Sequence, residues 1–133
     1  MQYVNLVAPL LLCKELIAPL KQARGAVVDL SFIAAHQVHS FAGSVCAVSK
    51  AGSSSFTREL GKVDVRVNVV APGELKAAIL SPGTEKVVGN EVPMKRLGRP
   101  EEVAEVVHLL SSSQSSYVYG TEIHINGGQH IDA

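Results

Sequence analysis

A cysteine and a lysine four residues apart, Cys46 and Lys50, are the first side chains in this sequence whose spacing suggests chemistry. A free thiol has a pKa of about 8.5, and a neighbouring ammonium group lowers it toward the reactive thiolate form. Two histidines in a His-x-x-His spacing, His36 and His39, are a second candidate, because imidazole is a common metal ligand. No third ligand lies near them in the sequence, so we expect a solvated loop and no metal site.

The other polar residues with reactive groups have structural explanations. The serine runs at residues 53–55 and 111–113 have no partnered base in the sequence. A serine nucleophile needs such a base, so we expect these runs on helix surfaces or in turns. The remaining histidines are scattered along the chain and are expected to be structural: His108, His124 and His130.

The composition is that of a neutral globular protein. The 133 residues are enough for one small domain, and a hydrophobic share of 47% favours a packed core. Lys plus Arg and Asp plus Glu number 12 each, so no excess charge attracts nucleic acid or an anionic membrane. Cys13 and Cys46 have no metal-ligand spacing and are expected to be reduced thiols in a cytoplasmic protein. The apolar run at residues 6–13 is too short to span a bilayer.

The elements that must position these side chains alternate as helix, strand, helix, strand, helix, strand. Strand–helix–strand units of this size imply a parallel sheet with right-handed crossovers, so the predicted fold class is α/β. The expected helices are residues 3–21, residues 44–61, a short one from Thr84 and one from Pro100, and the expected strands are residues 25–30, 63–70 and 122–125.

Several segments, in order along the chain, resemble the short-chain dehydrogenase/reductase family. Residues 49–51 read SKA, like the family's YxxxSKA helix start, and residues 66–73 read RVNVVAPG, like its RVNxVxPG segment. Residues 93–104 read PMKRLGRPEEVA, which is similar to PLxRxGxPEEVA, and residues 116–128 run from SYVYG to NGG, which is similar to SYVTG…DGG. Each match is weak alone, but together they cover essentially the whole chain. The resemblance implies one partial domain over residues 1–133: a truncated Rossmann-like sheet with its last three strands and flanking helices.

The same resemblance implies hydride transfer between NAD or NADP and a carbonyl or alcohol substrate. In the family a tyrosine exchanges the proton, a lysine four residues later lowers the pKa of that tyrosine, a serine polarises the carbonyl, and an asparagine helps to hold a relay water. Asn5 and Lys50 stand at the asparagine and lysine positions. Cys46 stands at the tyrosine position and Phe32 at the serine position, with Ser31 one residue before it.

These substitutions predict weak or absent catalysis. The thiol of Cys46 ends several atoms short of a phenol hydroxyl, whereas proton transfer needs heavy atoms roughly 2.6–3.2 Å apart. Neighbouring residues on an extended segment point to opposite sides, so the hydroxyl of Ser31 is expected to turn away from the place of the family's serine.

The cofactor contacts that the resemblance implies are also incomplete. Lys50, Pro72 and Gly73 match positions that meet the nicotinamide end of the cofactor. Ala77 replaces a threonine that touches the nicotinamide amide in the family. The dinucleotide-binding first half is missing, and no Gly-x-Gly-x-x-Gly loop occurs in the sequence to hold a pyrophosphate. Binding of NAD or NADP by this chain alone is therefore not expected.

Three interpretations of function stay open. In the first, the chain represents an oxidoreductase of this family with weak or absent activity. In the second, it is a non-catalytic interaction protein. The resemblance implies that helices 3–21 and 44–61 pack in a subunit-pairing bundle, which would join two copies or one copy and a full-length relative. In the third, it is the product of a pseudogene or an incomplete gene.

Overall fold

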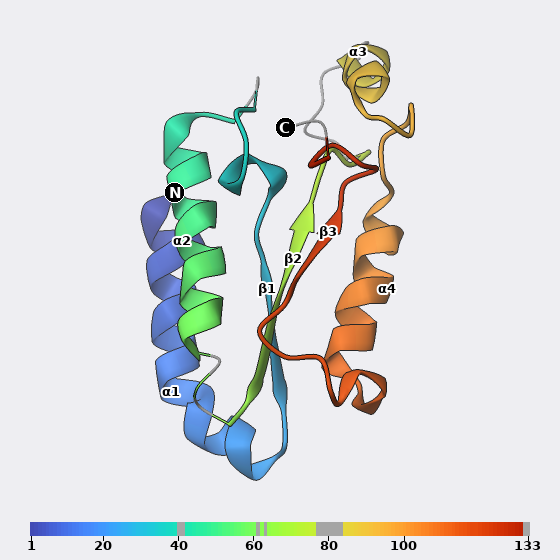
Figure 1. The fold of residues 1–133 in the computed structure, drawn as a ribbon. Helices are drawn as coiled ribbons and strands as arrows, with labels where there is room; N and C mark the ends of the chain where they lie inside the picture. The colour runs from blue at the N-terminus through green and yellow to red at the C-terminus, as the bar shows by residue number, and fades with distance from the viewer. Residues whose placement is uncertain (40–41, 61, 63, 77–83, 132–133) are drawn as a thin grey trace.

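The fold is a three-stranded parallel sheet between helices. A computed structural model describes residues 1–39, 42–60, 62, 64–76 and 84–131. The strands are Ala26–Leu30 (β1), Arg66–Pro72 (β2) and Glu122–Ile125 (β3), and the helices are Ala8–Gln22 (α1), Ser44–Leu60 (α2), Thr84–Glu91 (α3) and Pro100–Ser111 (α4). The strand order is β1-β2-β3, and both strand pairs are parallel. Figure 1 shows α1 and α2 on one face of the sheet, α4 on the other, and α3 beyond the carboxyl ends of the strands. The predicted α/β class and the three-stranded parallel sheet are confirmed.

The first helix begins as a π-helical turn, Tyr3–Val7, and continues as α1 to Gln22. Pro9 lies in the first turn of α1, which continues directly from the π-helical turn, so its missing N–H removes one hydrogen bond from the combined helix. The combined helix, Tyr3–Gln22, has 20 residues and is the one described helix long and apolar enough to cross a membrane, by length and composition only. The apolar run at residues 6–13, too short by itself to span a bilayer, is therefore part of a longer apolar helix. A core helix of a globular protein meets the same criterion.

The second strand is displaced along the chain from its predicted position, residues 63–70. It begins at Arg66 because Asp64 has a φ of 58°, a left-handed backbone conformation that does not continue a strand. It extends to Pro72 because the ladder with β3 continues to the pair Pro72–Ile125. Proline is tolerated there because it stands at the end of the strand.

Arg66, the first residue of β2, joins the sheet to the end of α4 by hydrogen bonds. Its guanidinium donates hydrogen bonds to the carbonyl oxygens of Leu110, Ser112 and Ser115 at 2.9–3.1 Å. The last carbonyl groups of a helix have no partner within the helix, so a cation placed there satisfies them. Asn68, two residues further along β2, is fully buried. The hydrogen bonds of Arg66 and the burial of Asn68 thus account for two residues of the RVN segment that carries the family resemblance.

Two serines on α2 face the sheet, which corrects the expectation that the run at residues 53–55 lies on a helix surface. Ser53 and Ser54 are 1% and 2% exposed. The hydroxyl of Ser53 donates to the carboxylate of Asp29 on β1. The hydroxyl of Ser54 lies 2.9 Å from that of Ser31 and 3.2 Å from a carboxylate oxygen of Glu122 on β3. The layer between α2 and the sheet is therefore partly polar, and the buried hydroxyls of Ser53 and Ser54 are hydrogen-bonded, whereas that of Thr57 has no partner.

Candidate functional site

The candidate site lies at the carboxyl ends of β1 and β2, where open α/β sheets bind their ligands. Ser31 follows β1 directly, and Pro72 ends β2. The first turns of α2 bring Cys46 and Lys50 to the same end of the sheet, and the π-helical turn brings Asn5. The fold thus gathers residues that are far apart in the sequence.

The two residues that match the family, Asn5 and Lys50, lie close together, but each is bound to the protein itself. The side-chain amide of Asn5 donates to the hydroxyl of Ser49 at 3.2 Å. The ammonium group of Lys50 donates to the carbonyl oxygen of Leu30, the last residue of β1, at 2.5 Å. A lysine held in this way caps the end of the strand and is not directed at the thiol of Cys46.

Ser31 and Phe32 follow β1, where the family resemblance predicts a serine. Ser31 is 5% exposed, and its hydroxyl donates to the carbonyl oxygen of Lys50 at 3.2 Å, so it faces α2. Phe32 is fully extended, with φ −162° and ψ 152°, and its ring packs against His39 with the ring centroids 5.0 Å apart. Adjacent residues on extended backbone point to opposite sides, which explains why Ser31 turns into the core while Phe32 packs against His39.

Gly73 is required for packing at the end of β2. A Cβ atom there would lie 2.1 Å from the side-chain oxygen of Gln129 and 2.5 Å from the Cβ of Asn126. The same oxygen of Gln129 accepts the backbone N–H of Glu74 at 3.1 Å. The segment after β2 is thus covered by the turn that follows β3. Ala77, the fourth residue after Gly73, lies outside the described residues.

The His-x-x-His pair lies in a loop, as expected, with His36 exposed and His39 largely buried. His36 approaches a carboxylate oxygen of Glu122 at 2.6 Å, and His39 approaches one of Glu74 at 2.5 Å. The side chain of His39 is only 9% exposed. Its Nδ1 accepts the N–H of Ala42, so Nε2 carries the proton that binds Glu74. The two histidines bind different carboxylates, and within the described ranges no group of three or more His, Cys, Asp or Glu residues could hold a metal ion.

Two of the three histidines interpreted as scattered meet in the structure. The rings of His124 and His130 are stacked, 4.4 Å between centroids and 9° from parallel, and His36 lies edge-on to His124 at 5.3 Å. Burial lowers the pKa of His124 below its usual 6.5, and the nearby His130 and His36 lower it further, while Glu122 acts in the opposite direction. Sequence reasoning missed this cluster, because His36 is far along the chain from His124 and His130, and the six-residue spacing of these two does not predict that their rings stack.

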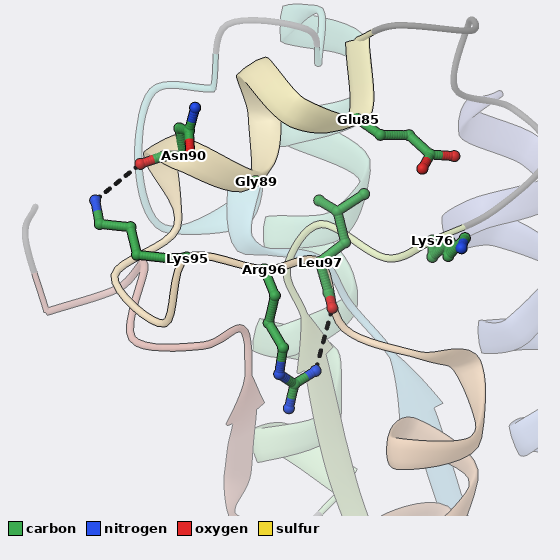
Figure 2. Close-up of a pocket in the computed structure, with 7 residues that line it drawn as sticks. All are labelled: Lys76, Glu85, Gly89, Asn90, Lys95, Arg96 and Leu97. Atoms are coloured by element: carbon green, nitrogen blue, oxygen red, sulfur yellow. Dashed lines mark hydrogen bonds between the residues drawn. The ribbon is translucent and has the colours of Figure 1, made fainter.

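A hollow of about 410 Å³ lies beside the end of α3 (Figure 2). Its cations do not converge on one point: Figure 2 shows Lys95 pointing toward Asn90 and Arg96 pointing away from both. Lys95 donates to the carbonyl oxygen of Asn90 at 2.9 Å, and Arg96 binds both carboxylate oxygens of Glu102 at 2.7 and 2.9 Å. Because Arg96 is paired with Glu102 and Lys95 is bound to Asn90, these two cations do not face a common point in the hollow, which Lys76 also lines.

Comparison with known proteins identifies the lineage. A family model described as enoyl-(acyl carrier protein) reductase matches residues 1–130. The chain belongs to the short-chain dehydrogenase/reductase family. It is 47% identical to protein FixR of Bradyrhizobium diazoefficiens, an alignment that covers 97% of this chain and 48% of that protein. It is 37% identical to 3-oxoacyl-[acyl-carrier-protein] reductase FabG of Aquifex aeolicus, over 94% of this chain and 53% of that protein.

Solved structures of this family superpose on the chain. A short-chain dehydrogenase from Leptospira borgpetersenii, determined with bound NAD+, has a TM-score of 0.86 and 28% sequence identity. The match covers 96% of this chain and 54% of that one. This short-chain dehydrogenase/reductase chain thus spans about half the length of its relatives.

The described residues do not fit a whole dinucleotide. A pyrophosphate is normally held by a glycine-rich turn and the helix N-terminus behind it, following the first strand of the sheet. In the described residues, the turn directly after β1 carries Ser31 and Phe32 and no glycine. Lys50 is bound to Leu30, and the side of Gly73 is occupied by Gln129 and Asn126.

Proposed function

We propose that this chain is a non-catalytic member of the family that does not transfer hydride by itself. The observation that carries the proposal is the placement of Ser31, whose hydroxyl is buried against α2, while its neighbour Phe32, which the resemblance aligns with the family's serine, has no hydroxyl. Cys46, which the resemblance aligns with the family's tyrosine, adds to it, because a thiol on the first turn of α2 ends several atoms short of a phenol hydroxyl.

An assay of the purified chain with NADH or NADPH tests this proposal. The substrates are a 3-oxoacyl thioester and a panel of simple ketones and aldehydes, and a full-length reductase of the family serves as the positive control. The matched variant restores both family residues, Cys46→Tyr with Phe32→Ser. We expect no turnover from either protein, because the restored groups have no bound hydride donor to act with. Turnover by the parent chain would refute the proposal, and turnover by the double variant would show that the chain binds a hydride donor.

A second function, as a pairing module, is favoured by the exposed apolar side chains of α1 and α2. Leu11 is 43% exposed, and Val45 and Val48 are 51% and 61% exposed. Exposed apolar clusters of this kind usually mark association surfaces. We propose that this face binds a second copy of the chain or a full-length relative, with no nucleic acid and no membrane among its partners. The free thiols of Cys13 and Cys46 fit a reducing compartment, which supports the cytoplasm.

A further inference from the structure

The histidine cluster lies next to the turn that covers the end of β2. This turn, residues 127–131, is named here the C-terminal turn. It is joined to the rest of the protein by three contacts besides the histidines. Gln129 accepts the N–H of Glu74 at 3.1 Å, the carbonyl oxygen of Gly127 accepts the N–H of Met94 at 3.1 Å, and Gly73 packs under Gln129.

His130 anchors the C-terminal turn to β3. The side-chain oxygen of Asn126 accepts the N–H of Gly128, so this atom is an acceptor, and Nδ1 of His130, 2.8 Å away, must donate to it. The ring that is fixed in this way lies parallel to that of His124 at 4.4 Å between centroids. The stack therefore links a strand residue to a turn residue.

The stack requires His124 to be neutral. Nδ1 of His124 is buried and has no hydrogen-bond partner. An imidazolium carries a proton on both ring nitrogens, and a buried N–H without an acceptor is costly. The neighbours of His124 oppose a positive charge on balance, because both His36 and His130 lie against its ring and only the carboxylate of Glu122 favours it. The other charged residues around the cavity that His124 and His130 share are Glu74, Arg96 and Glu102.

We propose that the stacked pair His124–His130 is a pH-sensitive clamp, which holds the C-terminal turn over Gly73 near neutral pH and releases it in acid. When the turn is released, His124 becomes solvated and takes up a proton at its ordinary pKa of about 6.5. The closed form takes up that proton only at lower pH. Acidification through this range therefore favours the released form, which uncovers the backbone of Gly73 and Glu74.

Amide hydrogen exchange of the whole chain, followed residue by residue by NMR between pH 7.5 and 5.5, tests the clamp. Glu74 and Met94 report on the C-terminal turn, and Ser31, which donates to Val70 within the sheet, is the internal reference. After correction for the intrinsic exchange rate, we expect protection at Glu74 and Met94 to fall below pH about 6.5. Uptake of one proton weakens closure by up to about tenfold per pH unit. Protection at Ser31 should stay constant.

Three variants complete the test. His124→Gln cannot titrate, so protection of Glu74 and Met94 should no longer depend on pH. His130→Gln removes the more exposed ring of the stacked pair. The backbone amides of Glu74 and Met94 should then be weakly protected from exchange at every pH. His108→Gln, on the exposed side of α4, should behave like the parent chain. The clamp is overturned if protection in the parent chain is flat, if His124→Gln keeps the pH dependence, or if Ser31 loses protection in parallel with Glu74.

Discussion

At the scale of single residues, the pair Arg96 and Glu102 gives the sharpest electrostatic effect outside the histidine cluster. Two hydrogen bonds from the Arg96 guanidinium and one from the backbone N–H of Arg99 hold the carboxylate of Glu102 in its charged form. The pKa of Glu102 is lowered to about 2, mainly by Arg96 and then by Arg99. The residue also closes the capping box at the start of α4.

Substitution Arg96→Gln is predicted to raise the pKa of Glu102 toward its usual 4.5, because the first cause of the depression is removed. A carboxyl group with a lowered pKa stabilises the folded state above its unfolded value, and this contribution is lost as the pH falls through the folded value. For Glu102 the window runs from pH 4.5 down to about 2. Carboxyl NMR titration measures the shift. Arg99→Gln, which leaves the backbone donor in place, is the control and should shift the pKa far less.

At the scale of elements, the polar layer between α2 and the sheet sets how firmly this helix is held. Ser54 stands at its centre, 2% exposed, between Ser31 on one side and Glu122 on the other. A buried hydroxyl of this kind contributes to stability mainly because its removal leaves its buried partners without a hydrogen bond.

Substitution Ser54→Ala is predicted to lower the free energy of unfolding by about 1–3 kcal/mol, because Ser31 and Glu122 each lose a partner in a buried environment. Ser55→Ala, on the exposed side of the same turn, should change it by no more than about 0.5 kcal/mol. Chemical denaturation followed by circular dichroism measures both. Equal effects of the two substitutions would contradict the view that the buried layer holds α2.

Apolar periodicity predicted most of the elements, but it could not show how α2 faces the sheet. The strand at residues 122–125 and the helix from Pro100 were predictable, because glycine and proline mark their ends. The inward position of Ser53 and Ser54 was not, since hydrophobic patterns assign small polar residues to the surface. The pairing of His39 with Glu74 and the stacking of His124 on His130 were equally hidden, because such contacts depend on how the loops fold back.

At the scale of the whole molecule, one edge of the sheet and an apolar hollow beside it are exposed to solvent in the described residues. The described part of β1 pairs only with β2, so its other edge presents unpaired backbone groups, and such an edge is a template for association. An apolar hollow of about 320 Å³ lies beside it, between α1 and β1, with the thiol of Cys13 in its wall. Burial raises the pKa of that thiol, and the charge of Asp29 adds to the effect.

The chain is predicted to sediment as dimers or larger species at micromolar concentration, because the open edge and the apolar face of α1 and α2 both favour association. Val48→Lys, which places a charge on that face, should shift the distribution toward smaller species. Leu109→Lys, at a partly exposed position of α4, is the matched control and should not. A single sharp monomer with cooperative thermal unfolding would show that the chain is self-sufficient.

The chain is also predicted not to bind NADH or NADPH with saturable micromolar affinity, because the described residues offer contacts only for the nicotinamide end. A titration that follows reduced-nicotinamide fluorescence measures this, with a full-length family member as the positive control. Saturation in the micromolar range would show that a binding surface exists apart from the glycine-rich turn of the family.

The parallel ladders also bear on how the chain reaches this fold. Ala26 pairs with Arg66, and Val69 pairs with Glu122, so each ladder joins segments separated by a long stretch of sequence that includes a helix. The entropy of closing these loops is lost before the strand contacts compensate for it. Folding is therefore expected to be slow for a domain of this size, and the apolar strands stay exposed to other chains while it proceeds. Binding of a partner during synthesis would shorten the time for which the apolar strands are exposed.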